Sequence, residues 1–300
     1  MATILFLTQR IPYPPNKGDK LRAFQVLNHW TGRHKVFLGC LVDDPEDWQH
    51  TERLRRQCAG AHFARLDPRI AQARSARALL TGQPLSLPYY RDRDLAAWVH
   101  GVLEAQRPDC AYLFSSVMAQ YVLDAAHRPA RVLMDFVDVD SEKWADYAAR
   151  KSFPARLVYA REARLLLRFD RQVAERTDAS IFVSEPEAAL FAERAPEVKA
   201  KLRVVPNGID AEYFSPDGAG TSPERAGTPQ LVFTGHMAYW PNVDAVVWFA
   251  DAVLPALRQR FPGIAEPMTW SRITPATRSV PPATVANSFK AKLRLPPPTV

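Results

Sequence analysis

The chain lacks any apolar run near the length of a membrane span. A helix needs about 20 consecutive apolar residues to cross a bilayer, and no stretch of the 300 residues approaches that length. The amino-terminus also lacks a basic leader with a cleavage site, because the chain enters an apolar run at Ile4–Thr8 almost at once. We therefore expect neither a membrane-spanning segment nor a signal peptide.

Cysteine is scarce, and its spacing fits no metal site. The chain has three cysteines, Cys40, Cys58 and Cys110. An odd number of widely separated thiols argues against a disulfide framework and against a zinc site. This usage is typical of a reducing compartment and predicts a cytoplasmic protein.

Motifs for nucleic-acid binding are missing, although the formal net charge is +7. We find no RNA- or DNA-binding motif and no basic stripe with interleaved aromatic residues, so we expect no nucleic-acid partner. The excess of arginine could instead attract a phosphorylated ligand or an anionic membrane face, and a GC-rich genome would by itself raise the arginine content.

Short apolar runs alternate with helical patterns along the first two thirds of the chain. Alternation of this kind predicts an α/β fold, with a doubly wound, Rossmann-like parallel sheet. Ser184 and Glu187 form a capping-box pattern, in which Glu187 reaches back to the backbone of Ser184. The expected strands are Ile4–Thr8, Val36–Val42, Ala111–Phe114, Val132–Phe136, Ser180–Val183 and Leu202–Val205, and the expected helices are Lys20–Trp30, Asp92–Ala105, Ala155–Arg176 and Ala188–Glu193.

Parallel sheets of this class bind ligands beyond the carboxyl ends of their strands. That rule predicts one cleft lined by the segments that follow the strands. These are Thr8–Lys20, Ser115–Ser116, Asp135–Ser141, Ser184, Asn207–Gly208 and Gly235–His236.

A hinge between two α/β domains is predicted at residues 202–242. The strand Leu202–Val205 stops at Pro206-Asn207-Gly208, a sequence that favours a tight turn. A Pro/Gly/Ser-rich stretch follows, and a second apolar run, Leu231–Thr234, ends at Gly235. The composition between the two runs is that of a flexible linker.

These residues carry a resemblance to a known family. The sequence VPNGIDAEYF followed by LVFTGHM resembles the interdomain region of GT-B glycosyltransferases of the family 4 type. The opening TQRIPYPPNKGDKLRAFQ and the later DFVDVDSEKW are similar to bacterial sugar transferases of exopolysaccharide and PEP-CTERM/exosortase loci. The resemblance covers roughly residues 1–262, and it implies a retaining sugar transfer that needs no metal or other cofactor.

The resemblance also implies a domain plan. Residues 1–205 would form the amino-terminal acceptor-binding domain, 206–230 the hinge and linker, and 231–262 the start of the donor-binding domain. A helix is expected at Val243–Arg260. Residues 263–300 have the composition of an irregular Pro-rich tail, which is either the product of a frameshift or a natural disordered tail. In both cases we expect the donor domain to be truncated and the chain to have little or no transferase activity.

The loop that leaves the first strand is the first candidate phosphate site. Gly18 permits close backbone approach, and free N–H groups at a helix start suit an anion. Lys20 and Arg22 add positive charge nearby. The resemblance implies that this loop, including Gly18, Asp19, Lys20 and Arg22, faces the nucleotide-sugar diphosphate and the acceptor. The alternative is a solvated loop in which Asp19 caps the helix.

A crowd of carboxylates ends the strand Val132–Phe136. Burying Asp135, Asp138 and Asp140 together would be costly, so we expect them to meet solvent, cations or sugar hydroxyls. Asp138 and Asp140 are the candidate catalytic residues, because a carboxylate there could assist deprotonation of an acceptor. Asp140 could instead cap a helix. The pair also spells the Asp-x-Asp of metal-dependent GT-A transferases, a second alternative.

Residues around the hinge complete the candidate site. The resemblance places Gly235 near the donor phosphates, with His236 beside it. Asn207 and Gly208 could line the cleft or simply form a turn.

The predicted function is transfer of a sugar from a nucleotide-diphosphate sugar to a glycan or lipid-linked acceptor in exopolysaccharide biosynthesis. The basic face of the helix Ala155–Arg176 could contact the inner membrane peripherally. The alternatives are a non-catalytic acceptor-binding protein, a GT-B nucleotide-sugar epimerase, and a GT-A enzyme that uses Asp138 and Asp140.

Overall fold

The structure is a computed structural model that describes residues 1–209, 211–212, 231, 233, 235 and 240–261. The chain divides into two units, Met1–Gly218 and Ala219–Val300. The domain boundaries expected at residues 205, 230 and 262 stay predictions. The tail 263–300 lies outside the described residues.

The first unit is built on a seven-stranded sheet in which every strand runs parallel to its neighbours. The strand order is β3-β2-β1-β4-β5-β6-β7, so the direction of winding reverses between β1 and β4. This confirms the doubly wound α/β fold. The strands are β1 (Thr3–Thr8), β2 (Lys35–Val42), β3 (Gly60–Arg65), β4 (Cys110–Phe114), β5 (Arg131–Val137), β6 (Ala179–Phe182) and β7 (Leu202–Val204).

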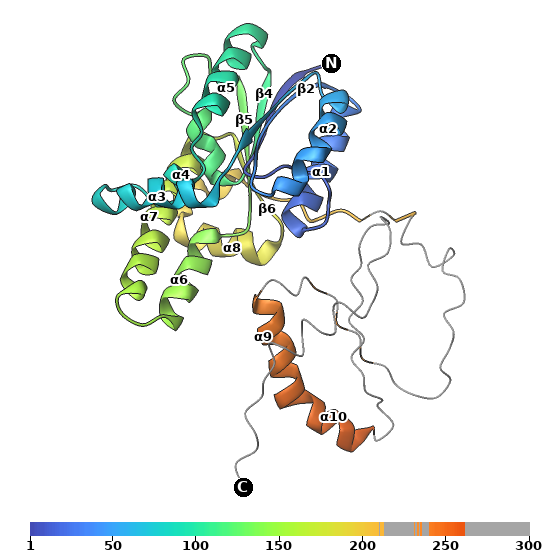
Figure 1. Cartoon of the computed structure of the whole chain (residues 1–300), viewed down its shortest axis with the longest axis vertical. Coiled ribbons are helices and arrows are strands. Elements are labelled where there is room, and N and C mark those ends of the chain that lie inside the picture. The colour runs from blue at the N-terminus through green and yellow to red at the C-terminus, as the bar shows by residue number, and fades with distance from the viewer. Residues whose placement is uncertain (210, 213–230, 232, 234, 236–239, 262–300) are drawn as a thin grey trace. The chain divides into compact units, whose positions relative to one another are not determined.

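Helices cover both faces of the sheet (Figure 1). They are α1 (Gly18–Thr31), α2 (Thr51–Gln57), α3 (Pro68–Ala76), α4 (Ser86–Tyr89), α5 (Arg93–Gln106), α6 (Asp140–Arg150), α7 (Ala155–Arg176) and α8 (Glu185–Arg194). The short helical turns are η1 (Pro45–His50), η2 (Arg77–Leu80), η3 (Ser116–Tyr121) and η4 (Pro196–Lys201).

Side chains alternate along β1, and this alternation produces two cores. Ile4 and Phe6 pack with α1 and α2 on one face of the sheet. Leu5 and Leu7 pack with α5 on the other face. All four side chains are buried. A strand with apolar residues on both faces is typical of a parallel sheet covered by helices on each side.

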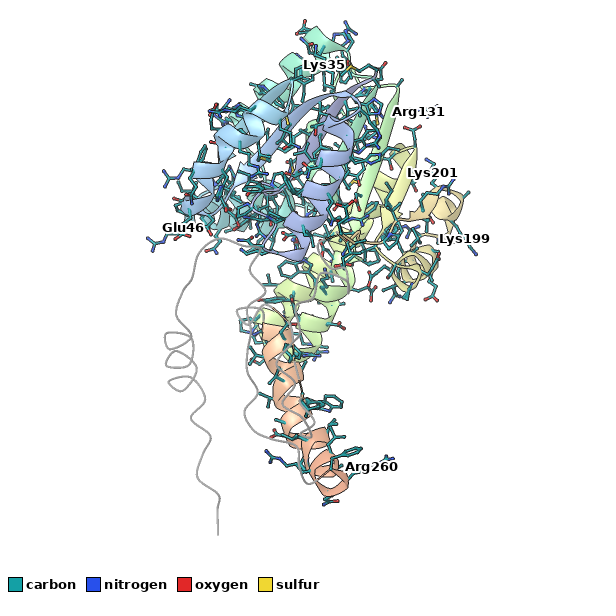
Figure 2. The ribbon with its side chains drawn as sticks, turned by 90° about the vertical axis from the view of Figure 1, so that its right-hand side faces the viewer. Lys35, Glu46, Arg131, Lys199, Lys201 and Arg260 are labelled. Carbon is teal, nitrogen blue, oxygen red and sulfur yellow. The ribbon has the colours of Figure 1, made fainter. Side chains whose placement is uncertain are left out.

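Figure 2 shows the common direction of the strands. Lys35 and Arg131, which begin β2 and β5, lie toward one end of the sheet, and Glu46, which follows β2, lies at the opposite end. The carboxyl ends of the strands and the loops after them therefore share one edge.

All six predicted strands of the first unit are confirmed, but β3 was not predicted. It lies at an edge of the sheet, and only Phe63 and Ala64 of its six residues are buried. Its apolar signal is therefore weak. The helices α2, α3, α4 and α6 were also not predicted, whereas α7 has the predicted bounds.

The predicted capping box at α8 is only half correct. The Ser184 hydroxyl accepts the Glu187 N–H, as expected. The Glu187 carboxylate does not reach back to Ser184, and Oε2 instead accepts the N–H of Val139 at 2.7 Å. Glu187 therefore links α8 to the loop that follows β5, because that loop offers an amide that α6 leaves free.

In the second unit the described residues form a helix in three parts. These are α9 (Trp240–Trp248), a π-helical turn (Phe249–Val253) and α10 (Leu254–Arg260). The helix predicted at Val243–Arg260 is confirmed, with the π turn as an addition. The predicted strand Leu231–Thr234 falls partly outside the described residues. Within the described part of the chain, we find no helix with the length and apolarity that a membrane crossing requires.

Candidate functional site

The carboxyl edge of the sheet has a switch point between β1 and β4. The connection after β1 leads to β2 on one side, and β4 continues the sheet on the other side. The loops after these two strands therefore diverge, and the space between them is where α/β sheets bind ligands. Two of the predicted segments, Thr8–Lys20 and Ser115–Ser116, follow β1 and β4 at this point.

The start of α1 is open, as the sequence suggested. The helix begins at Gly18, and the N-cap residue, Lys17, makes no side-chain cap. A Cβ added at Gly18 would meet nothing within 4 Å. Among the described residues, the N–H groups of Gly18 and Asp19 have no acceptor. Unpaired N–H groups at a helix start favour an anion.

Asp19 is not the N-cap of α1, which corrects one alternative. Its Oδ2 accepts from Arg10 Nη1 at 2.7 Å. The same guanidinium donates through Nε to both oxygens of Asp43, at 3.0 and 3.1 Å. Burial by itself would lower the pKa of Arg10, but the two carboxylates outweigh it and raise the pKa. Arg10 therefore joins the loops that follow β1 and β2.

Sequence reasoning did not single out Arg10 or Asp43. Arg10 lies two residues after β1, within the predicted segment Thr8–Lys20, and Asp43 directly follows β2. The same rule applied to the end of β2 could have added Asp43.

Lys20 and Arg22 point into the protein. Both are buried. Lys20 Nζ lies 2.5 Å from Oδ2 of Asp47 in η1. Arg22 donates from Nε and Nη2 to Asp135 at 2.9 and 3.2 Å, and from Nη1 to the Val205 carbonyl at 2.7 Å. Phosphate binding by these two residues stays a prediction, and in this structure each already has a carboxylate partner.

Asp135 lies at the centre of this buried network. It is fully buried, and Oδ2 also accepts from the Tyr112 hydroxyl at 2.5 Å. Burial raises the pKa of Asp135, while the Arg22 guanidinium opposes that rise. Of the partners expected for these carboxylates, namely solvent, cations and sugar hydroxyls, Asp135 meets a cation inside the protein. That cation is the guanidinium of Arg22, which is distant in sequence and supplies the compensating charge.

Two strained residues flank Asp135. Ser115, directly after β4, has φ 74°, and Val137, at the end of β5, has φ 68°. The Ser115 N–H donates to the Asp135 carbonyl at 2.8 Å, and the Val137 N–H donates to Oδ1 of Asp135 at 3.2 Å. A β-branched residue such as valine pays a steric penalty in this region. Strain held by surrounding contacts at a strand end is typical of binding sites.

The two predicted catalytic carboxylates meet at a lysine. Nζ of Lys143 lies 2.8 Å from Asp138 Oδ2 and 2.9 Å from Asp140 Oδ1. Burial opposes the charge of Lys143, but the two carboxylates prevail and raise its pKa. Asp140 is the first residue of α6 and makes no N-cap, since Val139 holds that position.

Asp138 and Asp140 therefore already bind a cation, the ammonium group of Lys143. Lys143 occupies the place between the carboxylates that a divalent metal would take. Within the described residues, no group of three or more histidine, cysteine, aspartate or glutamate side chains could hold a metal ion. Catalysis by Asp138 or Asp140 stays a prediction. Their side chains are 34% and 48% exposed, so both can reach a ligand.

The structure brings the hinge residues of the first unit to α1. Asn207 Oδ1 accepts from Arg22 Nη1 at 3.2 Å, and the Gly208 carbonyl accepts from Gln25 Nε2 at 3.0 Å. In the second unit, a Cβ at Gly235 would lie 2.9 Å from the Phe233 ring and 3.0 Å from Asn242 Nδ2. His236 lies outside the described residues. The roles of Asn207, Gly208, Gly235 and His236 in donor binding stay predictions.

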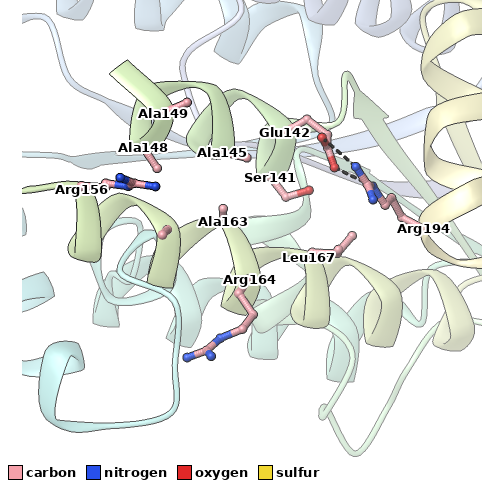
Figure 3. Close-up of a pocket in the computed structure, with 11 residues that line it drawn as sticks. Ser141, Glu142, Ala145, Ala148, Ala149, Arg156, Ala163, Arg164, Leu167 and Arg194 are labelled. Atoms are coloured by element: carbon pink, nitrogen blue, oxygen red, sulfur yellow. Dashed lines mark hydrogen bonds and ion pairs between the residues drawn. The ribbon is translucent and has the colours of Figure 1, made fainter. Parts of the chain in front are cut away.

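A groove of about 380 Å³ lies between α6 and α7 (Figure 3). Its floor is mostly alanine, and Arg156 and Arg164 line it together with the Glu142–Arg194 ion pair. The hydroxyl of Ser141 also lines the groove, and it is buried without a hydrogen-bond partner among the described residues. The sequence pattern did not indicate this groove, because α6 was not predicted.

No family model and no curated protein matches this sequence. Solved structures that match include the N-terminal domain of trehalose-6-phosphate phosphatase from Candida albicans, with 14% identity and a TM-score of 0.38. TcCGT1 in complex with UDP matches with 10% identity and a TM-score of 0.35. Each match covers 78% of this chain and 57% of the other chain, so this chain spans little more than half the length of either. Similarity at this level carries no argument about function.

Proposed function

We propose that this chain belongs to the GT-B sugar transferases of the family 4 type. The reaction would move a sugar from a nucleotide-diphosphate sugar to a glycan or lipid-linked acceptor in exopolysaccharide biosynthesis, with retention of the anomeric configuration. The observation that carries the proposal is the open start of α1 at the switch point of the sheet, where Gly18 leaves room for a ligand. The sequence resemblance supports the identity of that ligand.

The neighbouring groups suit a sugar and a diphosphate. The free N–H groups at Gly18 and Asp19 can donate hydrogen bonds to phosphate oxygens. Exposed carboxylates at Asp138 and Asp140 can accept hydrogen bonds from sugar hydroxyls. The strained backbone at Ser115 and Val137 is typical of a ligand-binding edge of the sheet. Asn207, Gly208, Gly235 and His236 would complete the donor side.

The proposed setting is the cytoplasm, with peripheral contact at the inner membrane. The turn between α6 and α7 supports this contact, because Phe153 and Leu157 are 78% and 61% exposed there. Lys151 and Arg156 lie beside them. Exposed apolar side chains next to basic ones favour an anionic bilayer surface.

Binding of nucleotide-diphosphate sugars to the purified chain tests the donor site. The variant Gly18→Val should weaken binding at least about tenfold, a change of about 1.4 kcal/mol, because its side chain fills the open space. Gly101→Val is the matched control, since Gly101 also lies in a helix with nothing within 4 Å of its Cβ position. Equal binding by all three proteins would refute the proposed donor site.

Product analysis separates the transferase from its alternatives. A glycoside supports transfer, whereas a free epimerised sugar supports the epimerase. Binding of a glycan with no affinity for nucleotide sugars supports a non-catalytic acceptor-binding protein. Activity lost on addition of EDTA supports a GT-A mechanism through Asp138 and Asp140.

A further inference from the structure

A second groove, of about 550 Å³, is lined mainly by arginine. We call it the arginine groove. Its arginines are Arg74 at the end of α3, Arg77 in η2, Arg91 in the loop before α5, and Arg93 in the first turn of α5. One carboxylate, Asp92, lines it with them. The volume is in the range of pockets that hold small molecules.

One carboxylate offsets only part of the charge of four arginines, and Asp92 makes no ion pair with any of them among the described residues. Oδ1 of Asp92 is the N-cap of α5 and accepts the Leu95 N–H at 2.9 Å. Within the described part of the chain, the guanidinium groups of Arg77, Arg91 and Arg93 have no acceptor and no carboxylate partner. Like charges that share one groove repel each other, so a bound anion would stabilise this arrangement.

The groove is also held in shape by hydrogen bonds. Arg74 donates to the carbonyls of Pro88 and Tyr89 at 2.5 and 2.8 Å, which fixes the end of α4 against α3. The Tyr121 hydroxyl donates to the Tyr90 carbonyl at 2.5 Å and accepts the Asp92 N–H at 2.8 Å. The backbone on both sides of Arg91 is therefore anchored. Binding of a ligand would cost little further conformational entropy in this loop.

The amino-terminus of α5 adds further positive potential to the arginine groove. α5 has 14 residues, and its amino-terminal residues Arg93 and Ala96 line the groove. The positive end of its dipole therefore adds to the arginine charges. Guanidinium groups bind phosphate oxygens through two parallel N–H donors, which gives geometric preference as well as charge.

We propose that the arginine groove binds the phosphate or diphosphate group of a ligand. The site is distinct from the open start of α1, and it does not depend on the proposed sugar transfer. The ligand can be a soluble phosphate ester or the headgroup of a phospholipid. Leu79 and Leu80, which follow Arg77 in η2, are 45% and 92% exposed, so an acyl chain would find apolar surface nearby.

Calorimetric titration of the full chain with inorganic pyrophosphate tests whether the groove binds a soluble phosphate ligand. Cosedimentation with phosphatidylcholine vesicles, with and without phosphatidic acid, tests whether it binds a phospholipid headgroup. The test variant is Arg77→Gln/Arg93→Gln, because both residues are exposed and their guanidinium groups have no hydrogen-bond partner among the described residues. The control is Arg65→Gln/Arg168→Gln, which removes the same charge from two exposed arginines outside the groove.

The test variant should bind at least about tenfold more weakly than the control double variant. Pyrophosphate binding that is lost in the test variant supports a soluble phosphate ligand, and vesicle binding lost in the same way supports a lipid headgroup. The proposal is overturned if the wild-type chain binds neither probe, or if both double variants weaken binding equally. No nucleotide sugar is used, so failure here leaves the proposed transfer untouched.

Discussion

Arg22 and Asp135 form a buried ion pair, although 113 positions separate them in the chain. The guanidinium of Arg22 extends from α1, and the carboxylate of Asp135 belongs to the buried part of β5. The side chains are 3% and 0% exposed. The pair ties α1 to the strand on the far side of the switch point. The open start of α1 therefore has a fixed position relative to the carboxyl ends of β4 and β5.

Replacing Arg22 should destabilise the protein strongly. Arg22→Met leaves the Asp135 carboxylate buried without its countercharge, and loss of one partner of a buried pair costs about 3–5 kcal/mol. Urea unfolding measures this change. The double variant Arg22→Met/Asp135→Leu should recover much of the loss, because no charge is then buried. A loss below about 1 kcal/mol in the single variant would show that the pair is not formed as described.

Glycine at position 115 should stabilise the protein. Ser115 has φ 74°, a conformation that glycine adopts without a steric penalty. Ser115→Gly should be more stable than Ser115→Ala by about 1 kcal/mol, since alanine keeps the strain. Comparing these two variants removes the effect of losing the hydroxyl. If alanine proves equal to glycine in urea unfolding, the backbone at this position is not strained.

Asp170 should make stability depend on pH. It is buried on α7, and its Oδ1 has no hydrogen-bond partner in the part of the chain that the structure describes. Burial raises its pKa from 3.8 to about 8. Below the unfolded value both states hold the proton. As pH rises from there toward 8, the unfolded state loses its proton and the folded state keeps it. The contribution of Asp170 to stability therefore falls by about 1.4 kcal/mol per pH unit in this window.

The variant Asp170→Asn isolates this effect. Asparagine has nearly the same shape and does not ionise, so the variant should match the wild type near pH 4 and exceed it increasingly up to about pH 8. Unfolding free energies of both proteins across the range measure the difference. A difference that stays constant with pH would mean that the pKa of Asp170 is ordinary.

Removing the lysine between the two candidate catalytic carboxylates should create affinity for a divalent cation. Lys143→Ala leaves Asp138 and Asp140 without the ammonium that both contact, and carboxylate oxygens on this spacing suit Mn²⁺. Electron paramagnetic resonance of Mn²⁺ measures the bound fraction. Lys143→Arg is the control, because it keeps the charge. Binding of Mn²⁺ to the wild type as tight as to Lys143→Ala would favour the metal-dependent alternative.

Most strands could be predicted because their signal is local. The strands from β1 to β7 that carry continuous apolar runs were found, and the missed one, β3, pairs on one side only and buries two residues. The helix α6 was missed for a similar reason. Its buried residues are only Ser141 and Ala148, small side chains that give little apolar periodicity.

The location of the candidate site could be predicted from the ends of the strands, but the contacts within it could not. The carboxyl-end rule predicts that Gly18, Ser115 and Asp138 lie at one edge of the sheet. It could not say that Lys20 would pair with Asp47, or that Glu187 would bond the Val139 amide. These partners lie 27 and 48 positions apart, so only packing brings them together.

The sequence by itself determined the alternation of strands and helices, because an apolar run indicates that its own segment is buried. That alternation also predicts the edge of the sheet at which a ligand should bind. Only the tertiary structure decided which charged residues face that edge. Arg22 and Lys20 are basic residues of the same helix as Gly18, yet both turn inward to buried carboxylates. Their direction depends on partners from distant strands and turns, and a charge in a low-dielectric interior is stable only where such a partner meets it.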